Sequence, residues 1–140
     1  MIILLNNGGT LSVTDYYSTQ YVKPVNVTGA GLTLLASIVN ENGIFAKFSR
    51  LVNPNNNKTQ VLTPGTRTDF GWAYLSTPDQ GLQPHNHKGI GLMIFGADSA
   101  SAKYIPNGSD TPIVALDENF NLGWSFTDST IDFQFDVIPN

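Results

Sequence analysis

The 140-residue chain contains no cysteine, and this absence excludes several kinds of site at once. Without cysteine there is no disulfide framework, no thiolate zinc site and no cysteine nucleophile. Charged residues make up only 13% of the chain, and the seven Lys and Arg residues are scattered in a chain of net charge −4. Because no basic patch is present for phosphate backbones or anionic lipid, we predict that nucleic acid is not a partner.

Long apolar runs are missing too. The run Met1–Leu5 has no basic segment before it and is far too short for a signal peptide or a membrane span. We therefore predict that the chain does not insert into a membrane.

Motifs of catalysis are also absent. The chain has no Gly-x-Ser-x-Gly elbow, no His-Glu-x-x-His pair and no phosphate-binding glycine loop. No pair of carboxylates has a spacing that predicts acid and base roles. We predict that the protein is not an enzyme.

The residues that are present indicate an all-β chain. Hydrophobic residues make up 41%, no window sustains helical spacing, and turn signals recur about every ten residues. The whole chain, 1–140, is predicted to be one antiparallel, immunoglobulin-like β-sandwich of about nine or more strands. The expected strands are Ile2–Leu5, Thr10–Tyr16, Leu32–Val39, Ile44–Leu51, Asp69–Leu75, Gly91–Phe95, Ile113–Leu116, Leu122–Phe126 and Thr130–Val137.

Two hairpins are predicted from turn chemistry and alternation. Asn42-Gly43 lies between two apolar runs, and this dipeptide favours a type I′ turn joining Leu32–Val39 to Ile44–Leu51. Apolar and polar residues alternate along 122–137, so one face of that hairpin must be buried. The side chains expected in the core are Phe48, Trp72, Trp124, Phe133 and Phe135.

Five short segments follow one another in an order that resembles the DOMON family, the domain found in dopamine β-monooxygenase and in extracellular cytochromes. The family opens a strand with Met or Leu, ends one with Asp-Tyr-Tyr, ends another with Phe-x-Arg, carries Trp-Ala, and places His before a basic residue and Gly. The matching positions are Met1, Asp15-Tyr16-Tyr17, Phe48-Ser49-Arg50, Trp72-Ala73, and His85 or His87 followed by Lys88-Gly89.

This resemblance implies a β-sandwich outside the cell that binds b-type haem or a sugar-like ligand between its loops. In haem-binding members a Met of the opening strand and a His of the loop hold the iron. At the matching positions of this chain, the resemblance implies Met1 and His85 as the iron ligands, with His87 as the alternative to His85.

The resemblance also implies an unusual chain order. Residues 1–96 resemble the middle and C-terminal strands of the family, 97–118 form a linker, and 119–140 resemble the N-terminal hairpin, while the strand that usually follows this hairpin is missing. We expect a domain whose strands are permuted in chain order, or a segment of a tandem array that begins and ends inside neighbouring units. The hairpin 122–137 then docks on its own domain or on a neighbouring copy, and docking between copies, which builds a filament, is the preferred alternative.

The candidate site residues each have a structural alternative. A solvated or hydrogen-bonded role in a loop is preferred for His85 and His87 over axial haem ligation. A metal site is not predicted, because Asp79 and Asp98 lack supporting spacing. Asp15 and Arg50 are expected to pair across strands.

Aromatic residues suggest a carbohydrate site. Trp72 and Tyr74, together with the loop Ser76–Lys88, could stack on a sugar, although a core position is preferred for any single aromatic.

Three sequons, at Asn26, Asn57 and Asn107, lie in turn-like polar segments and suggest an exported glycoprotein at the cell surface or outside the cell. The leading hypothesis is thus a binding or assembly module, one unit of a tandem or filamentous surface glycoprotein. The alternatives are a haem-binding electron-transfer domain and a carbohydrate-recognition module.

Overall fold

The computed structural model describes residues 1–19, 22–27, 31–74, 85–96, 103–106, 115–117 and 120–138. Within these ranges the chain is all-β, its strands pair antiparallel and no helix occurs, which confirms the predicted class. The strands are β1 (Ile2–Asn7), β2 (Thr10–Tyr17), β3 (Val25–Asn26), β4 (Thr33–Asn40), β5 (Gly43–Leu51), β6 (Arg67–Tyr74), β7 (His87–Ile94), β8 (Lys103–Pro106), β9 (Ala115–Asp117), β10 (Phe120–Phe126) and β11 (Thr130–Val137).

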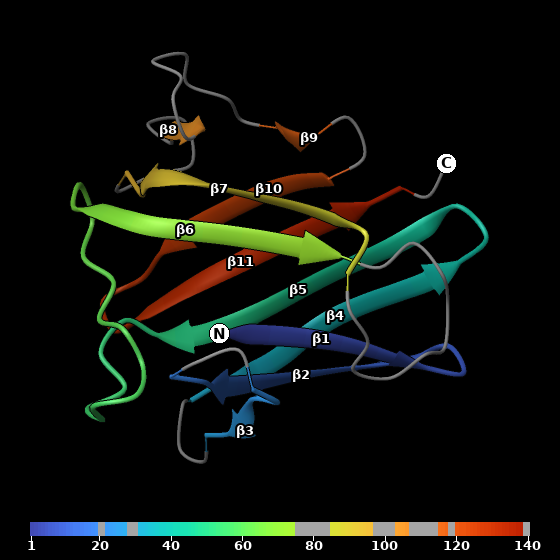
Figure 1. Ribbon diagram of the computed structural model, residues 1–140, viewed down its shortest axis with the longest axis horizontal. Helices are drawn as coiled ribbons and strands as arrows, with labels where there is room; N and C mark the ends of the chain where they lie inside the picture. The colour runs from blue at the N-terminus through green and yellow to red at the C-terminus, as the bar shows by residue number, and fades with distance from the viewer. Residues whose placement is uncertain are drawn as a thin grey trace.

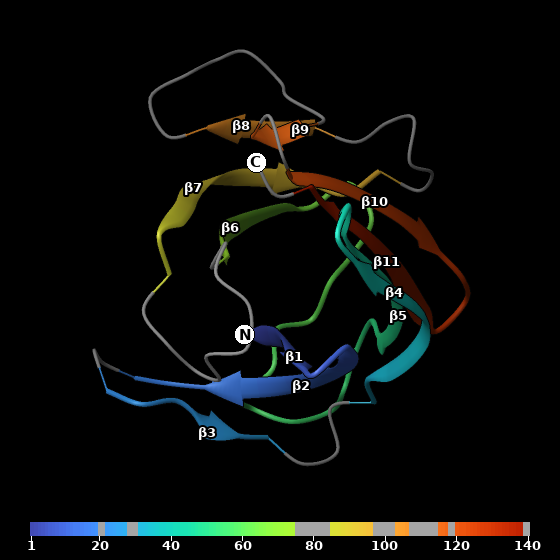
Figure 2. The same ribbon diagram turned by 90° about the vertical axis from the view of Figure 1, so that its right-hand side faces the viewer.

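The described strands form three sheets. The largest has five strands in the order β4-β5-β11-β10-β9, and the two smaller sheets are β1-β2-β3 and β6-β7-β8. In Figure 1, β6 and β1 lie toward the viewer and β11 and β5 pass behind them. Figure 2 shows the sheet of β6 and β7 on one side of the interior, the sheet of β1 and β2 on the other, and the large sheet curving between them.

A tight glycine turn joins β1 to β2. Gly8 and Gly9 have φ angles of 56° and 87°, and two positive φ angles in succession are what a type I′ turn requires. The side-chain oxygen Oδ1 of Asn6 accepts a hydrogen bond from the N–H of Gly9 at 3.0 Å. Asn7 pairs with Thr10 on either side of this turn, and the same register continues down to the pair of Ile2 with Asp15.

The hairpin of β4 and β5 has the predicted strands but a different turn. Asn40 pairs with Gly43, so the loop residues are Glu41 and Asn42, and neither has a positive φ. The predicted type I′ turn at Asn42-Gly43 is therefore wrong. The reason is local: Oδ1 of Asn40 accepts the backbone N–H of Asn42 at 2.8 Å, and Gly43, with φ 134°, becomes the first residue of β5.

The hairpin of β10 and β11 lies inside the large sheet of its own chain. β11 pairs with β5 from Thr130–Leu51 to Val137–Ile44, and β10 pairs with β11 on its other side. Both edges of β11 are thus occupied within one chain, which is the self-closed alternative. An exchange of this hairpin between copies would be a domain swap that replaces these pairings with identical ones.

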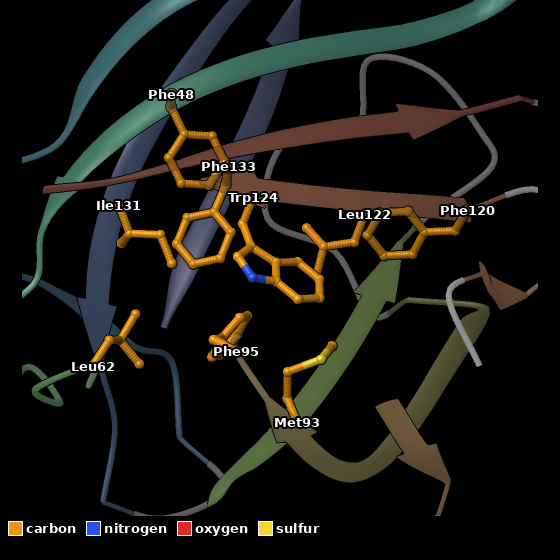
Figure 3. Packing of buried hydrophobic residues seen from close by; sticks show 9 residues of the cluster. All are labelled: Phe48, Leu62, Met93, Phe95, Phe120, Leu122, Trp124, Ile131 and Phe133. Carbon is orange, nitrogen blue, oxygen red and sulfur yellow. The ribbon is translucent and has the colours of Figure 1, made fainter. Parts of the chain in front are cut away.

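The core contains the alternate residues of these central strands. Phe48 and Ile131 are fully buried, Phe133 is 5% exposed and Trp124 is 6% exposed, whereas Trp72 and Phe135 are partly buried and pack against the cluster. The predicted burial of Phe48, Trp124 and Phe133 is therefore confirmed, and that of Trp72 and Phe135 is confirmed in part. Figure 3 shows the core cluster, which consists of Phe48, Leu62, Met93, Phe95, Phe120, Leu122, Trp124, Ile131 and Phe133.

Ring contacts hold this cluster together. The ring centroids of Phe48 and Phe133 lie 5.4 Å apart, and Phe95 meets the indole of Trp124 edge to face at 5.0 Å. The buried Nε1 of Trp124 has no hydrogen-bond partner among the described atoms, and Figure 3 shows this nitrogen on the side of the indole that faces Phe95.

Two strands were not expected from the sequence. Val25–Asn26 forms β3, and Lys103–Pro106, within the predicted linker 97–118, forms β8. Both are short and pair only at a sheet edge, so neither needs the alternating pattern of a half-buried strand. β7 also begins earlier than predicted, at His87, because His87 pairs with Tyr74 across the sheet.

Candidate functional site

A row of aromatic rings lies on one face of the β6–β7 hairpin. Trp72 and Tyr74 are two residues apart on β6, so their side chains point to the same face of the sheet. On the neighbouring strand, His87 pairs with Tyr74 and Gly89 pairs with Trp72. Trp72, Tyr74 and His87, called the aromatic row below, are all partly buried. Strand pairing has therefore brought together two residues predicted to contact a ligand and one predicted alternative haem ligand.

The rings of the aromatic row are nearly parallel. The imidazole of His87 stacks on the phenol ring of Tyr74 with centroids 4.5 Å apart and planes 4° apart. The indole of Trp72 lies 6.2 Å from the ring of Tyr74, with planes 17° apart. Three rings of common orientation thus follow one another along the sheet.

Gly89 makes this arrangement possible. A Cβ atom added at Gly89 would lie 2.6–2.7 Å from three atoms of the Trp72 indole, far closer than real Cβ atoms approach other atoms. The indole therefore covers the backbone of β7 at Gly89, where no side chain is present. Sequence analysis did not identify Gly89 as part of the site; the available signal was a glycine inside a strand, which often marks a close approach of another group.

Phe120 supports the aromatic row from the core. Its ring meets Trp72 edge to face at 5.5 Å and Tyr74 at 5.8 Å, and it contacts Phe135 in the same way at 5.3 Å. Phe120 is only 4% exposed. Because the supporting ring belongs to the core, the two rings on β6 are held in position on a rigid base.

The residues predicted to ligate haem are not brought together. In Figure 1, Met1 begins β1 on the left of the molecule, whereas β7, which starts at His87, begins on the right. Met1 is 59% exposed, and its amino group forms an ion pair with Asp15 at 3.0 Å. His85 is exposed just before β7, and the ring of His87 is stacked on Tyr74.

A metal site finds no support in the described ranges. No group of three or more His, Asp or Glu residues that could hold a metal ion occurs there. Asp79 and Asp98 lie outside the described residues, as does most of the loop Ser76–Lys88.

A separate polar cluster is buried between β2, β5 and the segment that follows β5. Asp15 is 1% exposed and Arg50 is 4% exposed. Oδ2 of Asp15 accepts a hydrogen bond from the hydroxyl of Thr59 at 3.0 Å, and Nη2 of Arg50 donates to the carbonyl of Gln60. Burial lowers the pKa of Arg50 and the charge of Asp15 raises it in part.

The expected pairing of Asp15 with Arg50 is therefore electrostatic rather than a direct ion pair, because each group is hydrogen-bonded elsewhere. Both Thr59 and Gln60 belong to the segment after β5. The cluster thus attaches this segment to the sheets, and we assign it a structural role.

Two of the three sequon asparagines lie at the surface. Asn26 and Asn57 are exposed, and Asn107 lies outside the described residues. Among the residues with a described structure, no helix is long and apolar enough to cross a membrane.

The chain matches no family model, no curated protein and no solved structure.

Proposed function

We propose that this protein is a non-catalytic, DOMON-like binding module of the cell exterior and that the aromatic row contacts a sugar. One observation carries the proposal: Trp72, Tyr74 and His87 form a parallel, partly exposed row on a rigid base. The apolar faces of sugar rings pack against aromatic side chains, and binding sites of small molecules combine apolar and aromatic walls with a few polar groups. The indole, phenol and imidazole rings supply both aromatic surface and polar groups that can form hydrogen bonds.

The site is rigid before a ligand arrives. Trp72 lies over Gly89 and against Phe120, so it has little rotational freedom to lose on binding. A ligand therefore costs the protein little conformational entropy, which favours binding through a small contact area.

Substitution of Trp72 by alanine tests the proposal. We expect the purified protein to bind one or more sugars on a glycan array, and Trp72→Ala to weaken that binding about tenfold or more, because the largest ring of the row is removed. Tyr17→Ala is the matched control: it removes a partly buried aromatic ring on β2, next to Lys58, that is not part of the row. A blank array with folded protein, or equal loss in both variants, would contradict the sugar site.

Location outside the cell is supported by the exposure of Asn26 and Asn57. We expect at least one sequon to carry a glycan in native material, since an exposed asparagine in a sequon is accessible to modification. The measurement is the intact mass before and after treatment with peptide-N-glycosidase. An unchanged mass would remove this argument for export.

The place of this module in a larger protein is part of the proposal. We assign the finer architecture to an immunoglobulin-like sandwich, cut in phase with a tandem array or a filament of copies. The support is the chain order: the hairpin that resembles the start of the family domain lies at residues 120–137, yet it occupies inner positions of the large sheet. A neighbouring copy could donate the same hairpin by exchange.

A further inference from the structure

Asn26, the first residue of a sequon, lies directly beside an aromatic side chain. It belongs to β3 and pairs with Tyr16 of β2, and directly opposite residues of an antiparallel pair share one face of the sheet. Asp15, the neighbour of Tyr16 in β2, is 1% exposed and points inward, so Tyr16 and Asn26 both point outward. Asn26 is exposed and Tyr16 is partly buried. Figures 1 and 2 both show β3 at the lower border of the molecule, beyond β2.

Backbone hydrogen bonds show that this pair is of the closer kind. The N–H of Tyr16 donates to the carbonyl of Met1 at 2.7 Å, and the N–H of Val27 donates to the carbonyl of Asp15 at 2.8 Å. The backbone groups of Tyr16 are therefore directed toward Met1, and Tyr16 and Asn26 form a non-hydrogen-bonded pair. In such a pair the Cα atoms lie about 4.5 Å apart and the side chains approach each other closely. A group of the size of a sugar, attached to Asn26, is thus within reach of the phenol ring.

We propose that Asn26 carries an N-linked glycan whose first sugar packs against the ring of Tyr16. The new bond joins Nδ2 of Asn26 to the anomeric carbon of a sugar on an activated diphosphate donor; the nitrogen loses one proton and the diphosphate leaves. The apolar face of the sugar then lies against the phenol ring. This inference rests on the proposed location outside the cell, but not on the ligand of the aromatic row.

The covalent bond makes a weak contact effective. A dissolved sugar loses its translational freedom when it binds, whereas an attached sugar is already held beside the ring at a high effective concentration. β3 has only two residues, Val25 and Asn26, and it pairs only with β2. A sugar that reaches from Asn26 to Tyr16 adds a cross-strand contact to this short strand, and its bulk covers the sheet edge against the addition of another strand.

The sequon at Asn57 has different surroundings and provides a matched control. Asn57 lies between β5 and β6, outside the strands of the described chain, so strand pairing places no ring beside it. Thr59 of this sequon is 8% exposed, and its hydroxyl donates to Oδ2 of Asp15 at 3.0 Å. A glycan at Asn57 therefore adds similar mass to the surface without a paired aromatic neighbour.

NMR spectroscopy of glycoproteins with a single glycan tests the proposal. The chain is exported from a glycosylating host behind an added signal sequence, Asn57→Gln and Asn107→Gln leave only the sequon at Asn26, and the glycan is trimmed to one N-acetylglucosamine. We expect nuclear Overhauser contacts between the sugar and the ring of Tyr16, and an upfield shift of the sugar protons that lie over the ring. The chain with Asn26→Gln and Asn107→Gln carries its sugar at Asn57 and should show neither signal. Absence of a glycan at Asn26, or of contact between its sugar and Tyr16, would overturn the proposal.

Thermal unfolding provides a second readout. We expect the sugar at Asn26 to raise Tm by about 3 °C over the glycan-free variant Thr28→Ala, which retains Asn26, because the contact with Tyr16 exists only in the folded state. Tyr16→Ala should abolish this increment and Tyr16→Phe should retain it, since the face of the ring makes the contact. Tyr17→Ala should also retain it, because Tyr17 points to the opposite face of β2.

Each tyrosine variant is compared with its own glycan-free form, so a general loss of stability cancels. An equal increment with and without the ring of Tyr16 would overturn the proposal. The added signal sequence imposes export, so a missing contact contradicts this inference alone, whereas native protein without any glycan would remove the argument for export.

Discussion

Replacement of Phe133 by alanine is expected to lower the free energy of unfolding by about 3–5 kcal/mol, which is a large part of the stability of a domain of this size. Phe133 is 5% exposed and contacts Phe48 at 5.4 Å and Phe95 at 5.7 Å between ring centroids. It therefore connects β11 both to β5 and to the residue that follows β7. Removing its ring leaves a cavity where the large sheet meets the β6–β7 hairpin. Urea unfolding, followed by tryptophan fluorescence, measures the change.

The neighbouring residue of the same strand is the control. Gln134 is exposed and pairs with Lys47 on the outer face, so Gln134→Ala should change the free energy of unfolding by less than about 0.5 kcal/mol. Similar losses in the two variants would mean that β11 is not held in the described register, because a shift by one residue exchanges the inner and outer faces.

Replacement of Gly89 by alanine is expected to disturb the aromatic row and to destabilise the domain by about 1–3 kcal/mol. The new Cβ would meet Nε1, Cε2 and Cζ2 of Trp72 at 2.6–2.7 Å. The indole is also in contact with Phe120, which is part of the core, so it cannot move away without disturbing other rings. We expect an altered near-ultraviolet circular dichroism spectrum, loss of sugar binding and a lower midpoint of urea unfolding.

Gly71 provides a matched glycine on the partner strand. A Cβ at Gly71 would lie 3.6 Å from Cγ2 of Ile90 and 3.8 Å from the carbonyl oxygen of Gly89, which are ordinary contacts. Gly71→Ala should therefore leave the spectrum unchanged and alter stability by no more than about 1 kcal/mol. If Gly89→Ala behaved in the same way as Gly71→Ala, the indole of Trp72 would not lie over β7.

Much of the fold could be predicted from local sequence because alternation and turn chemistry act over short distances. Residues 122–137 alternate in polarity, and their apolar members Leu122, Trp124, Ile131 and Phe133 are buried as predicted. The all-β class, the partners in the two predicted hairpins and most of the strand bounds could also be predicted from alternation and turn chemistry. The turn after Asn40 could not be predicted from Asn42-Gly43 alone, because Asn40, which lies outside that dipeptide, accepts a hydrogen bond from the N–H of Asn42.

The candidate site depends on both the local sequence and the tertiary structure. Trp72 and Tyr74 could be recognised from the sequence as aromatic residues on one face of a strand, since their spacing of two is a property of extended chain. The positions of His87 and Gly89 opposite them depend on the register between β6 and β7, which no local pattern specified. Phe120 comes from a distant strand and reaches the rings only because the sheets pack against one another.

The sequence by itself determined the class of the fold, the faces of its main strands and the absence of cysteine chemistry, because each depends on residue type and short spacing. Only the tertiary structure decided that Asp15 bonds to Thr59 rather than directly to Arg50, and that Met1 and His87 lie apart. It also decided that β11 lies between β5 and β10 and that β1 lies at the edge of the described sheet β1-β2-β3. These outcomes depend on which strands become neighbours, a choice made by the packing of the whole chain and not by any one segment.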